Sequence, residues 1–389
     1  MLNLFEKNMI SIIRASIDGT VPDVSDDFDY EKAYSFAQSM QIIPLVCYGI
    51  EKLPDAYSDT GSKKFLKSTI SYSFFCERQD REIEEILSAF DKEQIEYMRL
   101  KGAAIKKLYP RTEMRLMSDA DILINKKQYS KIKKIMNSFG YTEKVESDHE
   151  FVWSKDNTYI ELHKRLIPSY NKDYYKYFGD GWRLAKKKSD KPNEYVMSNE
   201  DCFIYLFVHY AKHYRDAGIG IKHLTDFYVY LKHYSELDWE YISKELEKLQ
   251  LYDFWLTTKN VLDVWFNDRE CDEKSAFVTR RIFCGSAYGT REAKILSDGV
   301  KISKSTKHVR AKRFWKSVFP SYQDLKQGYK FLKYLPVLLP IAWLIHCLRV
   351  IFNPKRIARK TKDLKAISAE NVKSYQDELN YVGLDFNFE

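Results

Sequence analysis

The sequence has few cysteines and lacks the cysteine spacing that builds a metal or disulfide framework. Six cysteines are scattered through 389 residues without a C-x-x-C pair. This pattern argues against a cysteine-ligated zinc site and against a disulfide-stabilised secreted fold. The six positions are Cys47, Cys76, Cys202, Cys271, Cys284 and Cys347.

Two membrane-related patterns are also missing. The N-terminus shows no basic start followed by an apolar run and a small-residue cleavage site, so the pattern gives no secretory signal. No clean run of about twenty apolar residues is present, which argues against a membrane-spanning helix. We expect a cytoplasmic protein.

The composition is that of an ordinary folded protein, with 44% apolar and 30% charged residues. The chain is long enough for two or three packed units. Its formal net charge of +8 favours anionic ligands or a membrane surface without requiring nucleic acid. Aromatic residues make up 15%, but no RNA- or DNA-binding motif accompanies them, so we do not expect a nucleic-acid partner.

The stretch Arg115–Ile124 carries most of the recognisable chemistry. Read as a strand, it buries one apolar face and directs Asp119 and Asp121 from the other. Like charges held this close repel unless a cation lies between them, so the pair calls for a divalent metal. Glu161 lies on the polar side of a second apparent strand, at residues 159–163. Three carboxylates on adjacent strands would form a two-metal phosphoryl-transfer site.

An Asp-x-Asp in a half-exposed strand also occurs by chance, but the surrounding sequence favours the catalytic interpretation. A predicted strand over Gln94–Leu100 ends in Lys101-Gly102 and runs into a short helix. Backbone N–H groups at that junction can hold phosphate, and Gly102 would allow its close approach. Lys101 and Arg115 would supply cations for the phosphate oxygens.

At these residues the sequence resembles the DNA polymerase β-like nucleotidyltransferase superfamily and, more narrowly, the bacterial proteins known as uncharacterised nucleotidyltransferases. The narrower group has the pattern Lys-Gly, Tyr-Pro, Arg, Asp-x-Asp and Glu-Leu-His. In this sequence the pattern is Lys101-Gly102, Tyr109-Pro110, Arg115, Asp119-Ala120-Asp121 and Glu161-Leu162-His163. Two departures from the wider superfamily are typical of the narrower group. Ala103 follows Gly102 where Gly or Ser is usual, and the gap from Gly102 to Asp119 is longer.

The resemblance implies transfer of a nucleoside monophosphate from an NTP to an acceptor hydroxyl, with two-metal catalysis by Mg²⁺ or Mn²⁺. Asp119, Asp121 and Glu161 would be the catalytic and metal-binding residues. The expected nucleotide-binding residues are Lys101, Gly102, Arg115, Ser118, His163, His209, His213 and Asp226. Because resembled proteins are associated with surface-polysaccharide production, the favoured acceptor is a sugar or a lipid-linked precursor. The sequence does not indicate the base of the NTP.

We predict an α+β fold, in which a polymerase β-like core with a mixed sheet is flanked by N-terminal and C-terminal helical regions. The expected regions are a helical cap at 1–90, the catalytic core at 91–195, a helical domain at 196–270 and a basic helical region at 271–389. Within the core, a helix is expected over Lys127–Phe139, followed by strands over Tyr141–Glu146, Glu150–Ser154 and Thr158–Arg165.

The helical domain contributes three further candidates. His209 and His213 are spaced i, i+4 on a predicted helix and could bind metal, but no third ligand of matching type lies near them in the sequence. Asp226 lies on a second predicted helix, Ile221–Lys232. These side chains either line the nucleotide or acceptor pocket or have a structural role, and the sequence leaves both interpretations open.

The C-terminal region shows the sharpest change in composition. Residues 301–316 hold seven Lys or Arg and no acid, residues 335–345 are mostly apolar, and a second basic run follows at 355–362. This pattern is typical of a helix lying in an anionic membrane surface, which would put residues 301–362 at the inner face of the membrane. A buried helix with solvated basic neighbours explains the same pattern.

The alternative to catalysis is a silent nucleotidyltransferase fold that binds a partner or a nucleotide, for example as a scaffold. The presence of all three acids, Asp119, Asp121 and Glu161, argues against it, because a silent relative commonly loses one.

Overall fold

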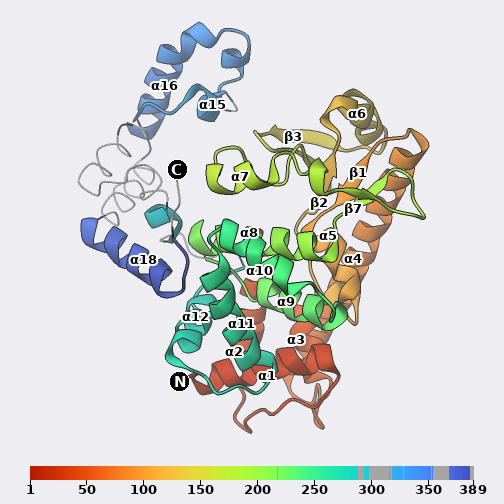
Figure 1. Cartoon of the computed structure of the whole chain (residues 1–389), viewed down its shortest axis with the longest axis vertical. Helices are drawn as coiled ribbons and strands as arrows, with labels where there is room; N and C mark the ends of the chain where they lie inside the picture. Colours follow the sequence, from red (N-terminus) through yellow and green to blue (C-terminus); the bar gives the residue numbers. More distant parts are fainter. Residues whose placement is uncertain are drawn as a thin grey trace. The chain divides into compact units, whose positions relative to one another are not determined.

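The computed structural model describes residues 1–216, 218–287, 293–297, 315, 318–326, 328–351, 353 and 368–385. By its internal contacts the chain divides into two compact units (Figure 1). The first unit consists of Met1–Ala211 and Ile219–Ala287, and the second of Lys212–Gly218 and Tyr288–Phe388.

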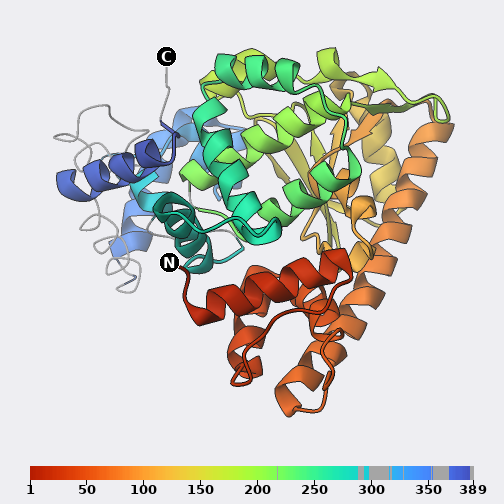
Figure 2. The same cartoon turned by 60° about the horizontal axis from the view of Figure 1, so that its bottom comes forward.

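The chain begins with four helices: α1 Leu4–Asp18, α2 Tyr30–Met40, α3 Ile43–Ile50 and α4 Thr60–Lys92. The helical N-terminal region expected from the sequence is therefore confirmed. Asn3 and Glu6 cap the start of α1 reciprocally, and Gly19, with φ of 73°, ends it in the left-handed conformation. The long helix α4 runs beside the sheet (Figure 2).

Seven strands of the described residues form one sheet in the order β3-β4-β5-β2-β1-β7-β6. Four of them, β1, β2, β3 and β7, are labelled in Figure 1. Their bounds are β1 Tyr97–Arg99, β2 Ala120–Ile124, β3 Thr142–Glu146, β4 Glu150–Lys155, β5 Thr158–His163, β6 Lys186–Lys187 and β7 Glu194–Val196. The pairs β2–β5 and β1–β7 are parallel and the other four are antiparallel. This mixed sheet with flanking helices confirms the predicted α+β fold.

One face of the sheet forms the hydrophobic core of the first unit. Alternate residues of β2 and β5 point into it, and α4 covers it together with α6, Tyr129–Ser138. The core side chains from these four elements are Ile83, Ile86, Leu87, Phe90, Ala120, Ile122, Ile124, Ile132, Met136, Ile160 and Leu162. The alternation of β2 and β5 directs Asp121 and Glu161 to the other face.

The strand boundaries differ from the sequence-based prediction at several places, and β5, for example, ends at His163 rather than at Arg165. Gln94 has φ of 53° and starts no strand, so β1 is limited to Tyr97–Arg99. β2 begins at Ala120, which leaves Asp119 just before the strand. Strands β6 and β7 were not predicted, because they are two and three residues long and hold too little apolar alternation to be recognised.

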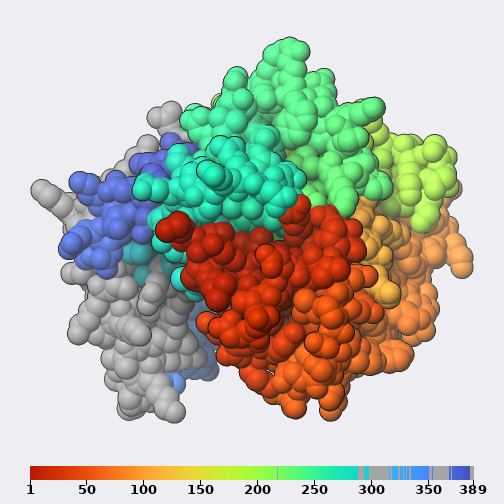
Figure 3. Space-filling model, turned by 90° about the horizontal axis from the view of Figure 1, so that it is seen from below, coloured from red at the N-terminus to blue at the C-terminus, as the bar shows by residue number. Residues whose placement is uncertain are grey.

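Two further helices lie between strands of the sheet, and the chain from 199 to 283 is mainly helical. The helices are α5 Lys101–Ile105, α7 Lys172–Phe178, α8 Asn199–Asp216, α9 Lys222–His233, α10 Trp239–Lys248, α11 Tyr252–Phe266 and α12 Glu273–Phe283. The N-terminal helices lie beside the segment that holds α11 and α12 (Figure 3), where Phe36 of α2 stacks on Phe283 with ring centroids 4.9 Å apart.

The second unit contains α15 Tyr322–Leu325, α16 Leu339–Ile351 and α18 Ala369–Tyr381. A small core formed by Leu325, Tyr329, Leu332 and Ala342 holds the part around α16 together. Among the described residues, no helix is both long and apolar enough to cross a membrane. The two basic runs at 301–316 and 355–362 lie outside the described residues, except for Trp315.

Candidate active site

Three side chains that could bind a metal converge on the polar face of the sheet. Asp121 of β2 is in register with Glu161 of the parallel strand β5, and His163 follows two residues later on the same face. One ligand atom from each of the three lies within 4.8 Å of the others. The convergence of Asp121 and Glu161 that the sequence alternation predicted is thus confirmed, whereas their roles stay a prediction.

Asp121 is the most heavily bonded member of this group. Its Oδ1 accepts from Lys101 Nζ at 2.7 Å and lies 2.8 Å from His163 Nε2. Burial opposes ionisation of this carboxyl, but the Lys101 ammonium and His163 hold its pKa below the ordinary value. The Asp121 carboxylate is therefore ionised and held in place by two nitrogen donors, a state in which it can bind a cation.

Lys101 stands at the junction of β1 and α5 in a strained backbone conformation. Its φ of 44° lies in the left-handed region, which non-glycine residues rarely occupy and which is concentrated at functional sites. Next to it, Gly102 is buried, and a Cβ there would meet Met117 Cγ and Sδ at 3.1 Å. Glycine at 102 is thus explained by packing on Met117, and its expected contact with phosphate stays a prediction.

Asp119 lies close to the same group without joining it. Its carboxyl is not among the ligand atoms that converge within 4.8 Å in the described residues. Burial raises the pKa of Asp119 to about 7, and the neighbouring charges of Asp121 and Glu161 act in the same direction. The repulsion between neighbouring acids that the sequence predicted therefore contributes to the raised pKa of Asp119.

Arg115 and Asp226, which the sequence analysis expected to bind nucleotide, bind each other. The guanidinium donates from Nε to Asp226 Oδ1 at 2.7 Å and from Nη2 to Oδ2 at 2.8 Å. Tyr109 of the Tyr-Pro motif donates to Asp226 Oδ1 at 2.7 Å. Because both side chains are nearly buried, this cluster fixes α9 against the core and leaves Arg115 engaged in an ion pair.

Lys222, one turn before Asp226, is a cation that the sequence analysis did not assign to the site. The residue is 8% exposed, its Nζ donates to Gln41 Oε1 at 2.9 Å, and within the described part of the chain it makes no ion pair. Burial, together with the Arg115 charge, lowers the pKa of Lys222 to about 7. Ser118 donates to the same Gln41 oxygen at 3.3 Å, which places this predicted site residue beside Lys222.

The two histidines of α8 do not join the converging acids. Neither His209 nor His213 belongs to a group of potential metal ligands among the described residues. His209 stacks with His223 of α9 at 6.0 Å between ring centroids. Tyr205, one turn before His209, brings a buried hydroxyl near Lys101 and Asp121, and this hydroxyl has no hydrogen-bond partner in the described structure.

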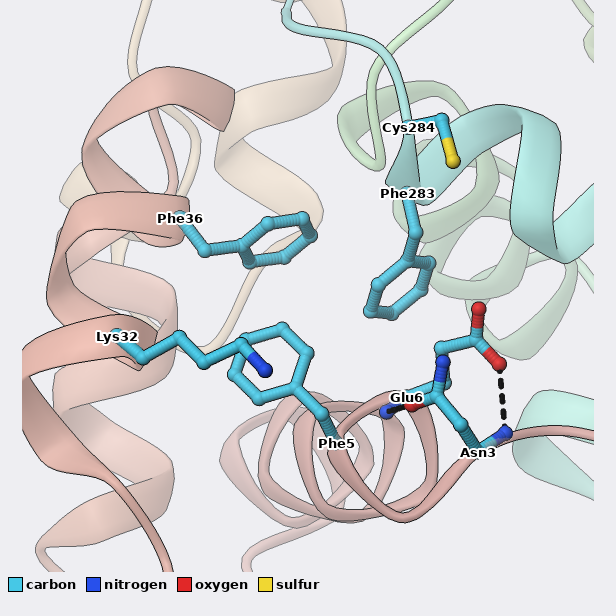
Figure 4. A pocket seen from close by; sticks show the side chains of 7 residues that line it. All are labelled: Asn3, Phe5, Glu6, Lys32, Phe36, Phe283 and Cys284. Carbon is cyan, nitrogen blue, oxygen red and sulfur yellow. Dashed lines mark hydrogen bonds between the residues drawn. The ribbon is translucent and has the colours of Figure 1, made fainter.

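A separate cavity of about 400 Å³ opens between the N-terminal helices and the end of α12 (Figure 4). Its lining residues are Asn3, Phe5, Glu6, Lys32, Phe36, Phe283 and Cys284. Three of the seven are phenylalanines, Lys32 lies over the Phe5 ring at 4.4 Å, and Glu6 is used in the α1 cap. None of the predicted site residues lines it, and its aromatic walls do not suit a triphosphate.

The chain matches a known protein family over more than half of its length. Residues 26–267 match the protein family described as "Uncharacterised nucleotidyltransferase". No curated protein matches the chain. Among solved structures, the solution structure of the antibiotic-resistance factor ANT(2″)-Ia is similar, at 15% identity and a TM-score of 0.32, over 49% of this chain and 98% of that one. Since the family match spans more than half of the residues and includes Asp121, Glu161 and Asp226, the chain belongs to the uncharacterised nucleotidyltransferase family.

Proposed function

We propose that this protein transfers a nucleoside monophosphate from an NTP to an acceptor hydroxyl and that Asp121 and Glu161 bind the divalent metal this reaction uses. The observation that carries the proposal is the convergence of Asp121, Glu161 and His163 on the polar face of two paired parallel strands. Asp121 and Glu161 are two of the three acids that the family resemblance implies as metal ligands.

The donor set fits a hard divalent cation. Carboxylate oxygens are the ligands that Mg²⁺ and Mn²⁺ prefer, and Asp121 is ionised and nearly buried. The raised pKa of Asp119 fits as well, because an added positive charge would relieve its repulsion from the other two acids. When bound, Mg²⁺ or Mn²⁺ would neutralise triphosphate charge and make the acceptor hydroxyl more acidic.

Two lysines of the chain are placed to hold the triphosphate. Lys101 bonds Asp121 here and would turn its ammonium toward a phosphate oxygen once nucleotide is bound. Lys222 lacks an ion-pair partner among the described residues, so a phosphate oxygen would supply the missing negative charge. The Arg115–Asp226 pair would contribute indirectly, because it fixes the helix that carries Lys222.

The acceptor is proposed to be a sugar or a lipid-linked precursor of a surface polysaccharide, reached at an anionic membrane. A band of large apolar side chains on and before α16 supports the membrane part. Its members, with their exposed fractions, are Tyr334 83%, Leu335 53%, Val337 79%, Ile341 49%, Leu344 62% and Leu348 44%. We call this set the apolar band.

The position and surroundings of the apolar band suit a helix that lies in the membrane surface. Val337, Ile341, Leu344 and Leu348 recur at spacings of four, three and four residues, so they form one stripe, while Ala342 is buried in the small core of the second unit. The sequence from 301 to 362 holds sixteen Lys or Arg and one acid, Asp324. Anionic lipids complement this charge.

Two other functions are less well supported. A silent scaffold fold does not explain why an ionised Asp121, Glu161 and a nearly unpaired buried Lys222 are kept within one region. Polynucleotide binding would require a basic surface near the site, and the strongest basic runs lie in the C-terminal region instead.

The proposal is tested by following label from each of four α-³²P-labelled NTPs into small molecules and lipids of a cell extract. Wild-type protein should transfer label only when Mg²⁺ or Mn²⁺ is present, and Asp121→Asn should abolish the transfer. Asp156→Asn, at the exposed β4–β5 turn, is the matched control and should behave as wild type. Nucleotide binding that is equal with and without chelator, together with no transfer, would support the silent fold.

A further inference from the structure

A second group of potential metal ligands shares His163 with the first, and its other two members have no part in the proposed reaction. It consists of His149, just before β4, Glu150, the first residue of β4, and His163, the last residue of β5. One ligand atom from each lies within 4.8 Å of the others. We propose that these three residues form a second site, for a nitrogen-preferring transition-metal ion such as Zn²⁺.

The β4–β5 pairing places the three ligands together. Glu150 is in register with His163 across the antiparallel pair, so both side chains stand on the same face. His149 Nε2 lies 2.7 Å from Glu150 Oε2, and the rings of His149 and His163 are 5.6 Å apart. The His149 carbonyl accepts from the Lys164 backbone N–H at 2.6 Å, which fixes the backbone on which the first ligand stands.

Ser147 orients His149 in the way that metal-binding histidines are usually oriented. Its Oγ lies 3.3 Å from His149 Nδ1, which leaves Nε2 directed at Glu150. The same Oγ accepts from the backbone N–H groups of His149 and Glu150, at 3.3 and 3.1 Å. The imidazole is therefore held from behind by a hydroxyl that the turn itself fixes.

An unpaired ring nitrogen of His163 independently indicates that a metal ion binds here. Its side chain is 1% exposed, and Nε2 is taken by Asp121 at 2.8 Å. Nδ1 is buried and has no hydrogen-bond partner in the described structure. A buried polar atom left unpaired is unfavourable, and a neutral histidine that donates from Nε2 to a carboxylate carries a free lone pair on Nδ1. This carboxylate–histidine arrangement is the one that prepares an imidazole for a metal.

The donor set selects the class of ion. Two imidazoles and one carboxylate suit Zn²⁺, Co²⁺ or Fe²⁺ better than Mg²⁺, which prefers oxygen ligands alone. Three protein ligands also leave a position open for water or another ligand. The inference does not rest on nucleotidyl transfer, because His149 and Glu150 have no role in the proposed nucleotide site.

Zn²⁺ binding to metal-free full-length protein, measured by calorimetry, tests the site. Wild type should bind one Zn²⁺ tightly, and His149→Ala should weaken this binding by at least about 10-fold, since even second-shell changes cost 10- to 100-fold. His233→Ala removes an exposed imidazole from α9 and should leave the affinity unchanged. Should His149→Ala unfold, His149→Gln serves the same purpose, with near-ultraviolet circular dichroism as the check on folding.

Two further measurements separate this site from its neighbour. The Glu161→Gln variant should still bind Zn²⁺. The His149→Ala variant should still bind nucleotide in an Mg²⁺-dependent manner. Zinc-edge X-ray absorption of the wild-type complex should show two imidazole ligands. Equal Zn²⁺ affinity in wild type and His149→Ala, or a zinc ion surrounded only by oxygen, would overturn the inference while leaving the proposed function standing.

Discussion

Arg115 and Asp226 form a two-point ion pair that joins the segment before β2 to α9, although 111 residues separate them in the sequence. Tyr109 adds a third bond to the same carboxylate. Two elements of the family pattern, Tyr-Pro and Arg, therefore meet at a residue of the helical region. The pair explains how α9, with Lys222 on it, keeps its place relative to β2.

Removing one partner of this pair should destabilise the protein strongly. Asp226→Asn leaves the Arg115 guanidinium buried without a counter-charge, and such losses cost about 3–5 kcal/mol. We expect a fall of that order in the free energy of unfolding, measured by urea titration. Glu240→Gln breaks an exposed helical pair with Lys244 and should change it by less than about 0.5 kcal/mol. Equal small effects in both variants would show that the buried pair is not structural.

Glu161→Gln should remove most of the metal dependence of nucleotide binding. The amide keeps the shape of the side chain but lacks the charge that a divalent cation needs, so we expect at least about a 10-fold loss of Mg²⁺ affinity. Calorimetry with a non-hydrolysable NTP, with and without Mg²⁺, measures this. Glu146→Gln alters an exposed carboxylate of β3 that pairs with Lys164, and it should bind as wild type does. Unchanged Mg²⁺ dependence in Glu161→Gln would contradict the proposed site.

Lys222 should make stability depend on pH. Its pKa in the folded protein is about 7, below the ordinary 10.5, because burial and Arg115 disfavour the charge while Asp226 and Asp119 favour it. Between pH 7 and 10.5 the unfolded chain therefore binds more protons, and stability rises with pH. In urea titrations, the free energy of unfolding of wild type minus that of Lys222→Met should increase from pH 7 to pH 9.5.

We also expect Lys222 to take up a proton when nucleotide binds. A phosphate beside Nζ favours the ammonium, so at pH 8 the wild type should take up a proton that Lys222→Met does not. Calorimetry in two buffers of different ionisation enthalpy gives the number of protons. Lys232→Met, an exposed lysine of α9 that pairs with Asp18, is the control. Identical proton uptake in wild type and Lys222→Met would exclude contact between Lys222 and phosphate.

Local patterns in the sequence were sufficient to predict the face of the sheet on which Asp121 and Glu161 converge. Strict alternation in β2 and β5 indicated which side each carboxylate occupies, and the register of parallel strands then places Asp121 opposite Glu161. The start of β2 was not predictable in the same way, because Asp119 continues the alternation without joining the strand. Its exclusion depends on tertiary pairing, which no local pattern encodes.

Long-range partners could not be read from the sequence. Arg115 was expected to hold phosphate because cations near an Asp-x-Asp usually do, yet its carboxylate partner comes from a helix far along the chain. Lys222 was visible as a residue one turn before Asp226, but only burial makes it unusual. Glu150 was predicted only as the start of a strand and His149 was not singled out, because their meeting with His163 depends on the β4–β5 register.

The apolar band should bind anionic membranes. Full-length protein should sediment with vesicles that contain phosphatidylglycerol, less so with purely zwitterionic vesicles, and the bound fraction should fall as salt rises, because salt screens the attraction of the basic sequence for the lipid. Replacing Val337, Ile341 and Leu344 together by Ser removes exposed apolar side chains that contribute little to the core, so folding should persist while vesicle binding drops.

A matched triple substitution elsewhere separates insertion from general surface hydrophobicity. Leu66, Ile70 and Phe74 form an exposed stripe on α4, at 40%, 51% and 69% exposure, and replacing them by Ser should leave vesicle binding intact. We expect the substitutions in the apolar band to abolish salt-sensitive binding and those in α4 to preserve it. This result would show that binding requires both the basic charge and the apolar band. If both triple variants bind like wild type, electrostatic attraction alone holds the protein on the lipid, and the prediction that α16 inserts is wrong. If wild type does not bind at low salt, the membrane interpretation of the apolar band is wrong.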